Sequence, residues 1–450
     1  MSRLCKNSPT LHRRAGLGIA VYPRRRDYNS GVKLRRVFNS LNIPSAYLPN
    51  FIHLYFDIGW FGILSGSSIS FLSVYAARLG ASGLQLGLLS SMSAAVSLLL
   101  AIPAGRWLEK QNIARAVFGA SVWYRLGYLL WVPLPWLFDQ QAQVWALIAI
   151  AFLMAIPLTP LSVGFNALFA AAVPNEWRAH VAGIRNIVYA IAFILSSLGS
   201  GYLLERLPFP IGYQVVFGIG FFGAAMSSLH LYFIKPLPAD SPPLHDHPAP
   251  APVIESESTP RHWLAALRLD VWRSPFGRIL LVFLGFHTAQ YMALPLFTLY
   301  VVRILHLSDD QIGLGTALFY LTVLIGSTQL DRIVRRFGHH KVTGVSVAGL
   351  AAYAFFLALS KTPLHYYLTS LIGGLNFALL LGAYANYLLE EIPEHDRPAH
   401  LAWYNVVLNA SILAGSLTGP LIGNVTGIAE ALLLVALLRF LSGLAILKWG

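Results

Sequence analysis

Residues 75–88 read YAARLGASGLQLGL, and residues 300–314 read YVVRILHLSDDQIGL. Both stretches carry Tyr-x-x-Arg, then Ser-x-x-Gln, then a glycine two residues after the glutamine. The Tyr-x-x-Arg motifs are 225 residues apart, and further matches follow in the same order at separations that fall to 219 residues. They pair Leu108-Glu109-Lys110 with Leu330-Asp331-Arg332, Asn166-x-Leu168 with Asn386-x-Leu388, and Val173-Pro174-x-x-x-Arg178 with Ile392-Pro393-x-x-x-Arg397. Ordered matches at a nearly constant separation indicate two related halves.

The composition is that of a membrane protein. Apolar residues make up 56% of the 450 residues, charged residues only 11%, and the mean hydropathy is +0.60. Soluble domains carry about 25% charged residues, so much of this apolar surface must face lipid. No alternation of the kind that transmembrane strands show is present. We therefore expect an all-α membrane protein.

Twelve spanning helices fit between residues 49 and 450, since each needs roughly 20 apolar residues. We expect them at 50–76, 83–104, 113–132, 142–170, 181–204, 213–234, 276–301, 311–329, 342–360, 365–388, 400–422 and 428–448. The repeat divides them into two pseudo-symmetric six-helix bundles, 49–235 and 276–450. Residues 1–48 are expected to be a basic, disordered cytoplasmic arm.

Basic residues gather in alternate loops, where Arg106, Arg178, Arg185, Arg335 and Arg397 lie. The remaining loops hold few cations. This bias places both chain ends in the cytoplasm, and we expect a bacterial inner membrane. It also accounts for the net charge of +13 without a nucleic-acid partner.

Residues 236–275 are expected to form a cytoplasmic linker between the halves. Its Pro-rich first part is typical of a solvated segment, and residues 263–273 have the pattern of an amphipathic interfacial helix. His245-Asp246-His247 could bind a metal, but no further ligands accompany these residues, so we expect a linker without a metal site. Cys5 is the only cysteine, which excludes an intrachain disulfide and a Cys-based metal site. We expect no cofactor.

The chain resembles the major facilitator superfamily over residues 49–450. The resemblance lies in the loop Gly105-x-x-x-Glu109-Lys110-x-Asn112-x-x-Arg115, in its second copy from Asp331 to Gly338, and in the two Pro-x-x-x-Arg loops. Asn112 stands where the family has a second glycine, and asparagine tolerates a left-handed turn. The resemblance implies a monomeric transporter of small solutes that rocks its two halves around a central site.

The resemblance further implies a cytoplasmic gate in these loops. Its residues would be Gly105, Glu109, Lys110, Arg178, Asp331, Arg332 and Arg397. Acids among cations at helix ends can form marginal ion pairs that break when the site opens. The alternative is that these charges only set the topology.

Asp57 is the most informative polar residue, because it lies well inside the first expected span, where a charge is costly. His53 lies one turn earlier on the same face. Burial disfavours the charged carboxylate, so we expect Asp57, with His53, to couple proton movement to transport. An ion pair that fixes helix packing is the alternative, and Arg125 is among the cations that can reach Asp57.

Other polar side chains mark the expected solute cavity. His287, Gln290 and Tyr291 share one face of the seventh span, although a histidine satisfied within the core explains that face nearly as well. The full set of cavity candidates is Arg125, Asn166, His287, Gln290, Tyr291, Asn376 and Asn386.

These observations predict a secondary active transporter of a small organic solute rather than an enzyme. We expect proton coupling and lean towards efflux of amphipathic compounds. Nutrient uptake by a symporter of the same fold is the alternative, as is a non-transporting, receptor-like relative. A membrane-embedded transferase would need His, Asp or Glu converging at one face, and the sequence shows no such cluster.

Overall fold

The structure is a computed structural model that describes residues 44, 47–237, 268–393 and 396–450. Its contacts separate Met1–Leu48 from Pro49–Gly450. Most of the expected arm, the Pro-rich linker with His245-Asp246-His247, and the start of the expected amphipathic helix lie outside the described residues.

The first half consists of six long helices. The first span is continuous through α2 (Leu48–Leu64), the π-helical turn η1 (Ser65–Ile69) and α3 (Ser70–Arg78). After it come α4 (Gly83–Glu109), α5 (Ile113–Trp131), the short α6 (Leu134–Leu137), α7 (Gln140–Ala172), α8 (Asn175–Arg206) and α9 (Ile211–Phe233).

The second half repeats this plan after a four-residue helix, α11 (Asp270–Arg273). Its first span is again continuous through a π-helical turn, from α12 (Pro275–Leu299) into η2 (Tyr300–Ile304). The remaining helices are α13 (Asp309–Phe337), α14 (His339–Leu359), α15 (Pro363–Glu390), α16 (Arg397–Thr426) and α17 (Ile428–Trp449).

The predicted fold class is confirmed. Eleven helices of the described chain are long and apolar enough to cross a membrane, and α5, which carries two arginines in 19 residues, is the twelfth by position. Several helices extend past the expected spans: α8 starts at Asn175 and α13 ends at Phe337. Hydropathy detects only the apolar part of a helix, whereas its backbone hydrogen bonds continue into the polar boundary.

The loop at Asn112 differs from the expectation. Asn112 has φ −67°, not a left-handed conformation, and its side-chain oxygen accepts a hydrogen bond from the Arg115 amide at 3.2 Å. The residue therefore caps the N-terminus of α5, a position that asparagine favours because it satisfies an otherwise free backbone donor.

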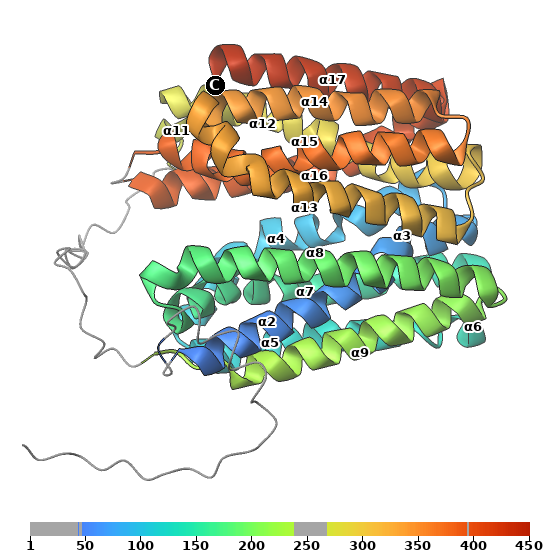
Figure 1. The fold of residues 1–450 in the computed structure, drawn as a ribbon, viewed down its shortest axis with the longest axis horizontal. Coiled ribbons are helices and arrows are strands. Elements are labelled where there is room, and N and C mark those ends of the chain that lie inside the picture. Colours follow the sequence, from blue (N-terminus) through green and yellow to red (C-terminus); the bar gives the residue numbers. More distant parts are fainter. Residues whose placement is uncertain (1–43, 45–46, 238–267, 394–395) are drawn as a thin grey trace, which may run out of the picture. The chain divides into compact units, whose positions relative to one another are not determined.

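Two helix pairs make the most extensive contacts between the halves, α4 with α16 and α8 with α13. Figure 1 shows α8 in green beside α13 in orange. Small residues permit the close approach, since a Cβ on Gly87 would lie only 2.2 Å from the Ser416 carbonyl oxygen. The end of the bundle that carries Glu109 and the segment 331–336 is called the basic face, and the other end, with Arg78 and Asp309, the clamp face.

Gly87→Ala tests this contact. The added methyl group overpacks α4 against α16, and we expect the free energy of unfolding in detergent to fall by about 1–3 kcal/mol. Gly119 is the control, because nothing lies within 4 Å of a Cβ placed there. Gly119→Ala should be neutral or slightly stabilising, since alanine favours a helix. Equal melting temperatures for the two variants would contradict the close packing.

Candidate functional site

Asp57 lies at the centre of a buried charge cluster in the first half. It is 3% exposed, and its Oδ1 accepts a hydrogen bond from Ser227 Oγ at 2.5 Å. Arg125 Nη2 lies 3.7 Å from Oδ1, and Arg185 Nη2 lies 3.5 Å from Oδ2. Four helices therefore converge on one carboxylate: α2, α5, α8 and α9.

The two arginines are held differently. Arg125 donates from Nη1 to Ser228 Oγ at 2.9 Å, so α9 fixes it in place. Arg185 stacks on α7, with its guanidinium carbon 4.7 Å from the ring centre of Phe165 and 5.7 Å from that of Phe169. Such stacking stabilises a cation in an apolar surrounding.

His53 does not join Asp57 in a hydrogen bond. Its Nδ1 lies 3.0 Å from the Nδ1 of His230 on α9, and its ring stacks on Phe233. Both histidines are partly buried. His53 lies on the same side of α2 as Asp57, one turn nearer the basic face, and there it pairs with His230.

The expected cavity residues of the second half divide into two groups. His287 is buried, and its Nε2 lies 3.1 Å from the hydroxyl of Tyr404 on α16. Gln290 and Tyr291 are partly buried on the same helix. The backbone oxygen of Gln290 accepts a hydrogen bond from the buried Arg439 at 3.2 Å.

The three asparagines lie on other helices, Asn166 on α7 and Asn376 and Asn386 on α15. Asn166 and Asn386 are exposed and Asn376 is partly buried. The side chains of Asn376 and Asn386 donate to carbonyl oxygens of their own helix, at 2.9 and 3.4 Å. Exposed amides in apolar helices are costly against lipid and are expected along a water-filled path.

Arg185 was assigned to an inner loop, and this assignment was wrong. It lies ten residues into α8 and is 8% exposed. The signal was present in the sequence, because residue 185 falls inside the expected span 181–204. Ser227, His230 and Tyr404 were also missed, since isolated Ser, His and Tyr residues are common in spanning helices.

The repeated Tyr-x-x-Arg motif forms a reciprocal clamp at the clamp face. Arg78 Nη2 donates to the Leu307 carbonyl at 2.6 Å, and Arg303 Nη2 donates to the Ala81 carbonyl at 2.5 Å. Each arginine thus reaches into the corresponding loop of the other half. Arg78 also pairs with Asp309 at 3.0 Å.

The rest of the motif supports this clamp. Tyr213 donates to Asp309 Oδ2 at 2.8 Å. Tyr75 donates to Gln143 at 2.5 Å, and its repeat partner Tyr300 donates to the Ala358 carbonyl at 2.8 Å. Both tyrosines are buried, so each anchors the end of its span to the end of a neighbouring helix, α7 or α14.

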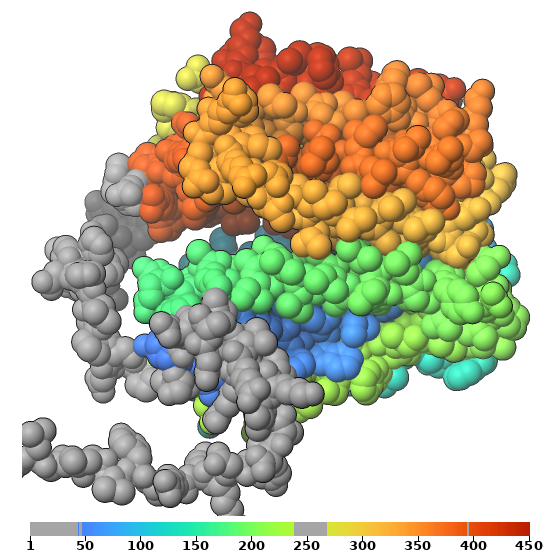
Figure 2. All heavy atoms as spheres, viewed as in Figure 1, coloured from blue at the N-terminus to red at the C-terminus, as the bar shows by residue number. Residues whose placement is uncertain are grey.

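The expected gate residues at the basic face behave differently. Arg178 donates to the Ala170 carbonyl at 2.7 Å, Asp331 pairs with Arg335, and Arg332 donates to Gln329. All three contacts stay within one half. Gly105, Glu109, Lys110 and Arg397 lie at the same face. Figure 2 shows a hollow at this end, between the first turns of α8 and the orange helices of the second half.

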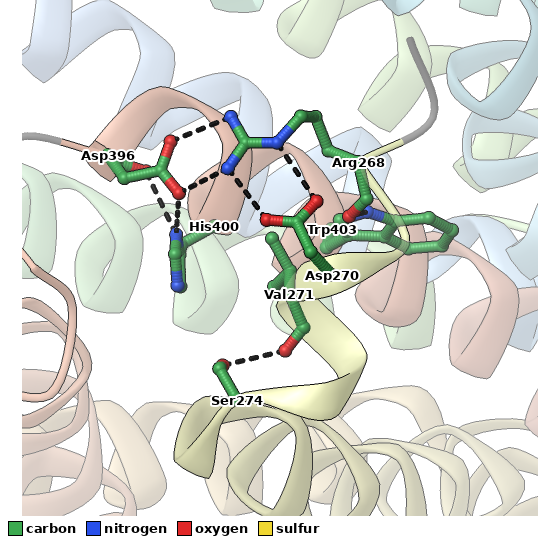
Figure 3. Close-up of polar contacts among 7 residues, drawn as sticks. All are labelled: Arg268, Asp270, Val271, Ser274, Asp396, His400 and Trp403. Carbon is green, nitrogen blue, oxygen red and sulfur yellow. Dashed lines mark hydrogen bonds and ion pairs between the residues drawn. The ribbon is translucent and has the colours of Figure 1, made fainter. Parts of the chain in front are cut away.

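A second ionic cluster fastens the chain that enters α12 (Figure 3). Arg268 donates to both carboxylate oxygens of Asp396, at 2.9 and 2.6 Å, and to both of Asp270. Trp403 Nε1 donates to the Arg268 carbonyl at 3.1 Å. The hydrogen bonds from Arg268 hold the pKa of Asp396 below its usual value. This exposed cluster joins α11 to the start of α16.

No group of three or more His, Cys, Asp or Glu residues in the described part of the chain is placed to hold a metal ion.

The charge cluster predicts an order of stabilities. Asp57→Asn leaves two buried guanidinium groups without a counter-ion, a change that costs about 3–5 kcal/mol. Arg185→Gln leaves one carboxylate facing one guanidinium, so we expect a smaller loss. Thermal unfolding of the purified variants measures both, with Asp139→Asn as control, because Asp139 only caps α7 and asparagine caps equally well. A variant Asp57→Asn as stable as this control would contradict the ion pairing.

Comparisons with known proteins agree with this architecture. The family model of the Major Facilitator Superfamily matches residues 58–303 and 279–450. The staphyloferrin B transporter of Staphylococcus aureus is 32% identical over 187 residues, which cover 38% of this chain and 42% of that protein. A putative sugar efflux transporter of Deinococcus radiodurans is 22% identical over 417 residues, covering 90% of this chain and 97% of that protein.

Solved structures show the same fold. A D-xylose–proton symporter superposes with a TM-score of 0.66 at 16% identity, covering 90% of this chain and 98% of the other. A nucleoside transporter, NupG, superposes with a TM-score of 0.63 at 13% identity, covering 89% and 98%. The chain is an integral membrane protein with twelve spanning helices in two halves, and it belongs to the major facilitator superfamily.

Proposed function

We propose that this transporter is secondary active, that it moves a small organic solute by alternating access, and that the structure is its state open to the basic face. The observation that carries the proposal is the difference between its two ends. At the clamp face each half donates a hydrogen bond into the other, whereas the contacts of Arg178, Asp331 and Arg332 at the basic face stay within one half. One gate is closed and the other is open.

The basic face is proposed to be cytoplasmic, because its loops carry most of the positive charge. Both chain ends would then lie in the cytoplasm of a bacterium, with the protein in the inner membrane as a monomer. Gly105, Glu109, Lys110, Arg178, Asp331, Arg332 and Arg397 would approach across the halves when this side closes. Their exposed ion pairs are weak, which suits contacts that form and break in every cycle.

The solute is proposed to bind between Arg185, with the neighbouring Asn166, in the first half and Gln290 and Tyr291 in the second. The full-length relative whose name refers to sugar efflux supports a lean towards export. The D-xylose–proton symporter of the same fold keeps uptake as the second candidate.

Breaking the clamp should close the basic face. Asp309→Asn weakens the pair with Arg78 by about 1 kcal/mol, which shifts a two-state equilibrium roughly five-fold. A cysteine at the exposed Asn405 of α16, with Cys5→Ser, reports on the open side, and we expect a water-soluble maleimide to label it more slowly. Lys361→Ala, which removes a charge at the clamp face, is the control. An unchanged labelling rate in Asp309→Asn would contradict the assigned state.

Proton coupling is proposed to act through Asp57. The guanidinium groups of Arg125 and Arg185 face this carboxylate and favour its charged form. Asp57 would take up a proton when Arg185 moves away, and this links protonation of Asp57 to the movement of α8. The labelling rate at residue 405, divided by that of free cysteine at each pH, should change with pH when Asp57 is present, as it also is in the Asp139→Asn control. In Asp57→Asn it should not. If the pH dependence survives in Asp57→Asn, another group carries the proton.

A further inference from the structure

The buried cluster of the first half carries more positive than negative charge. Its only carboxylate is Asp57, and the two guanidinium groups of Arg125 and Arg185 face it. With all three groups ionised the cluster has a formal charge of +1. A net charge buried in the middle of a membrane protein is costly unless a counter-ion completes it.

Arg185 has a terminal guanidinium nitrogen that is not used in a hydrogen bond to any described residue. Its Nη2 reaches Asp57 at 3.5 Å, which is long for a charge-assisted hydrogen bond, whose usual length is about 2.7–2.9 Å. Its Nη1 is buried and has no hydrogen-bond partner among the described residues. Within the described chain Arg125 also has a buried nitrogen without a partner, Nε, but its terminal Nη1 donates to Ser228 at 2.9 Å. One side of the Arg185 guanidinium therefore lacks an acceptor.

We propose that Arg185 binds an anionic group of the transported solute, and that this group is a carboxylate. The planar fork of a guanidinium matches the two oxygens of a carboxylate. The solute would supply the acceptor that Nη1 lacks and neutralise the remaining charge. This proposal rests on the proposed transport function and names the class of solute.

The position of Arg185 fits a solute site. Ten residues into the 32-residue helix α8, Arg185 lies about 15 Å from the helix start at 1.5 Å per residue, on the basic-face side of the helix centre. Helix α8 packs against α13 of the other half, and Asn186, the next residue, is exposed. The rings of Phe165 and Phe169 beside the guanidinium offer an apolar wall for an organic skeleton.

In the second half, the residue at the repeat position of Arg185 is uncharged, and the buried Arg439 is engaged with the Leu350 and Gln290 carbonyls. Tyr404 lies 219 residues after Arg185, the same separation that joins Arg178 to Arg397, so a tyrosine occupies the repeat position of the arginine. On α12, Gln290 Oε1 is buried and has no hydrogen-bond partner among the described residues, so it can accept a hydrogen bond from a hydroxyl or amide. The expected solute is an organic monoanion with such a donor on the part remote from its carboxylate.

Matched pairs of compounds test this class directly. The probes are benzoate with benzamide, nicotinate with nicotinamide, and gluconate with glucose, each pair differing at the carboxylate. The readout is the rise in unfolding temperature of the purified full chain. At least one carboxylate should stabilise the unaltered protein, and its amide or neutral partner should not. Arg185→Gln should weaken the apparent affinity for that carboxylate about ten-fold or more.

Two variants serve as controls. Arg206→Gln makes the same chemical change at the other end of α8, where the arginine lies over the Tyr202 ring, and it should bind the carboxylate normally. Arg185→Lys keeps the charge but loses the fork, so its affinity should fall between those of the unaltered protein and Arg185→Gln. Because Arg185→Gln leaves Asp57 and Arg125 balanced, we expect the variant to fold, and its melting temperature without ligand verifies this.

The outcomes separate the solute class from the transport function. Stabilisation by neutral partners alone, no response to any carboxylate, or a carboxylate response that survives in Arg185→Gln overturns the anion site. A neutral compound that crosses liposomes containing the protein overturns the anion site and leaves transport standing. A carboxylate that binds through Arg185 but never crosses the liposome membrane supports the anion site and contradicts transport.

Discussion

Two arginines, each of which donates a hydrogen bond to a loop of the opposite half, hold the two halves together at one end. The functional interpretation of the structure depends on them. Arg78 and Arg303 each cap a carbonyl in the loop of the opposite half. Carbonyl partners make the contact reversible, because no buried charge is stranded when the loops part. Only Arg78 adds an ion pair, since Asp309 has Gly83 at its repeat position. The clamp is therefore symmetric in its hydrogen bonds and asymmetric in its charge.

This clamp explains why the motif could be found in the sequence before its role was known. Tyr75 and Tyr300 are buried anchors, and Gln85 and Gln311 accept hydrogen bonds from the amides of Ser82 and Ser308 at the helix starts. Both sets of contacts are local and need the same residue types at the same spacing in each half. What the spacing did not reveal is that each arginine crosses to the other half, because a cross-half contact leaves no trace in local periodicity.

Hydropathy and the repeat were sufficient to predict the twelve helices, since a membrane leaves a spanning segment few alternatives to a helix. They were not sufficient for the site. Asp57 was recognised because an acid in an apolar helix stands out, whereas Arg185 was taken as a loop cation although it is buried ten residues into α8. Burial of a long side chain depends on its neighbours, here Phe165 and Phe169, which lie twenty and sixteen residues earlier in the chain. Only the packed structure brings them together.

The same duplication produced a symmetric scaffold and an asymmetric interior. The loops of the repeat recur in both halves, and the first and seventh spans each contain a π-helical turn, η1 within the first and η2 at the end of the seventh. The charges do not recur: α8 carries Arg185 where α16 carries Tyr404. The proposed rocking would require the two halves to have similar outer frames, so their packing and gates would be constrained alike. A solute with one charged end imposes no such symmetry on the wall that it touches. With Arg185 holding the proposed solute in one half, the other half would contact it through the neutral groups of Gln290 and Tyr291 and would move past it at a lower desolvation cost.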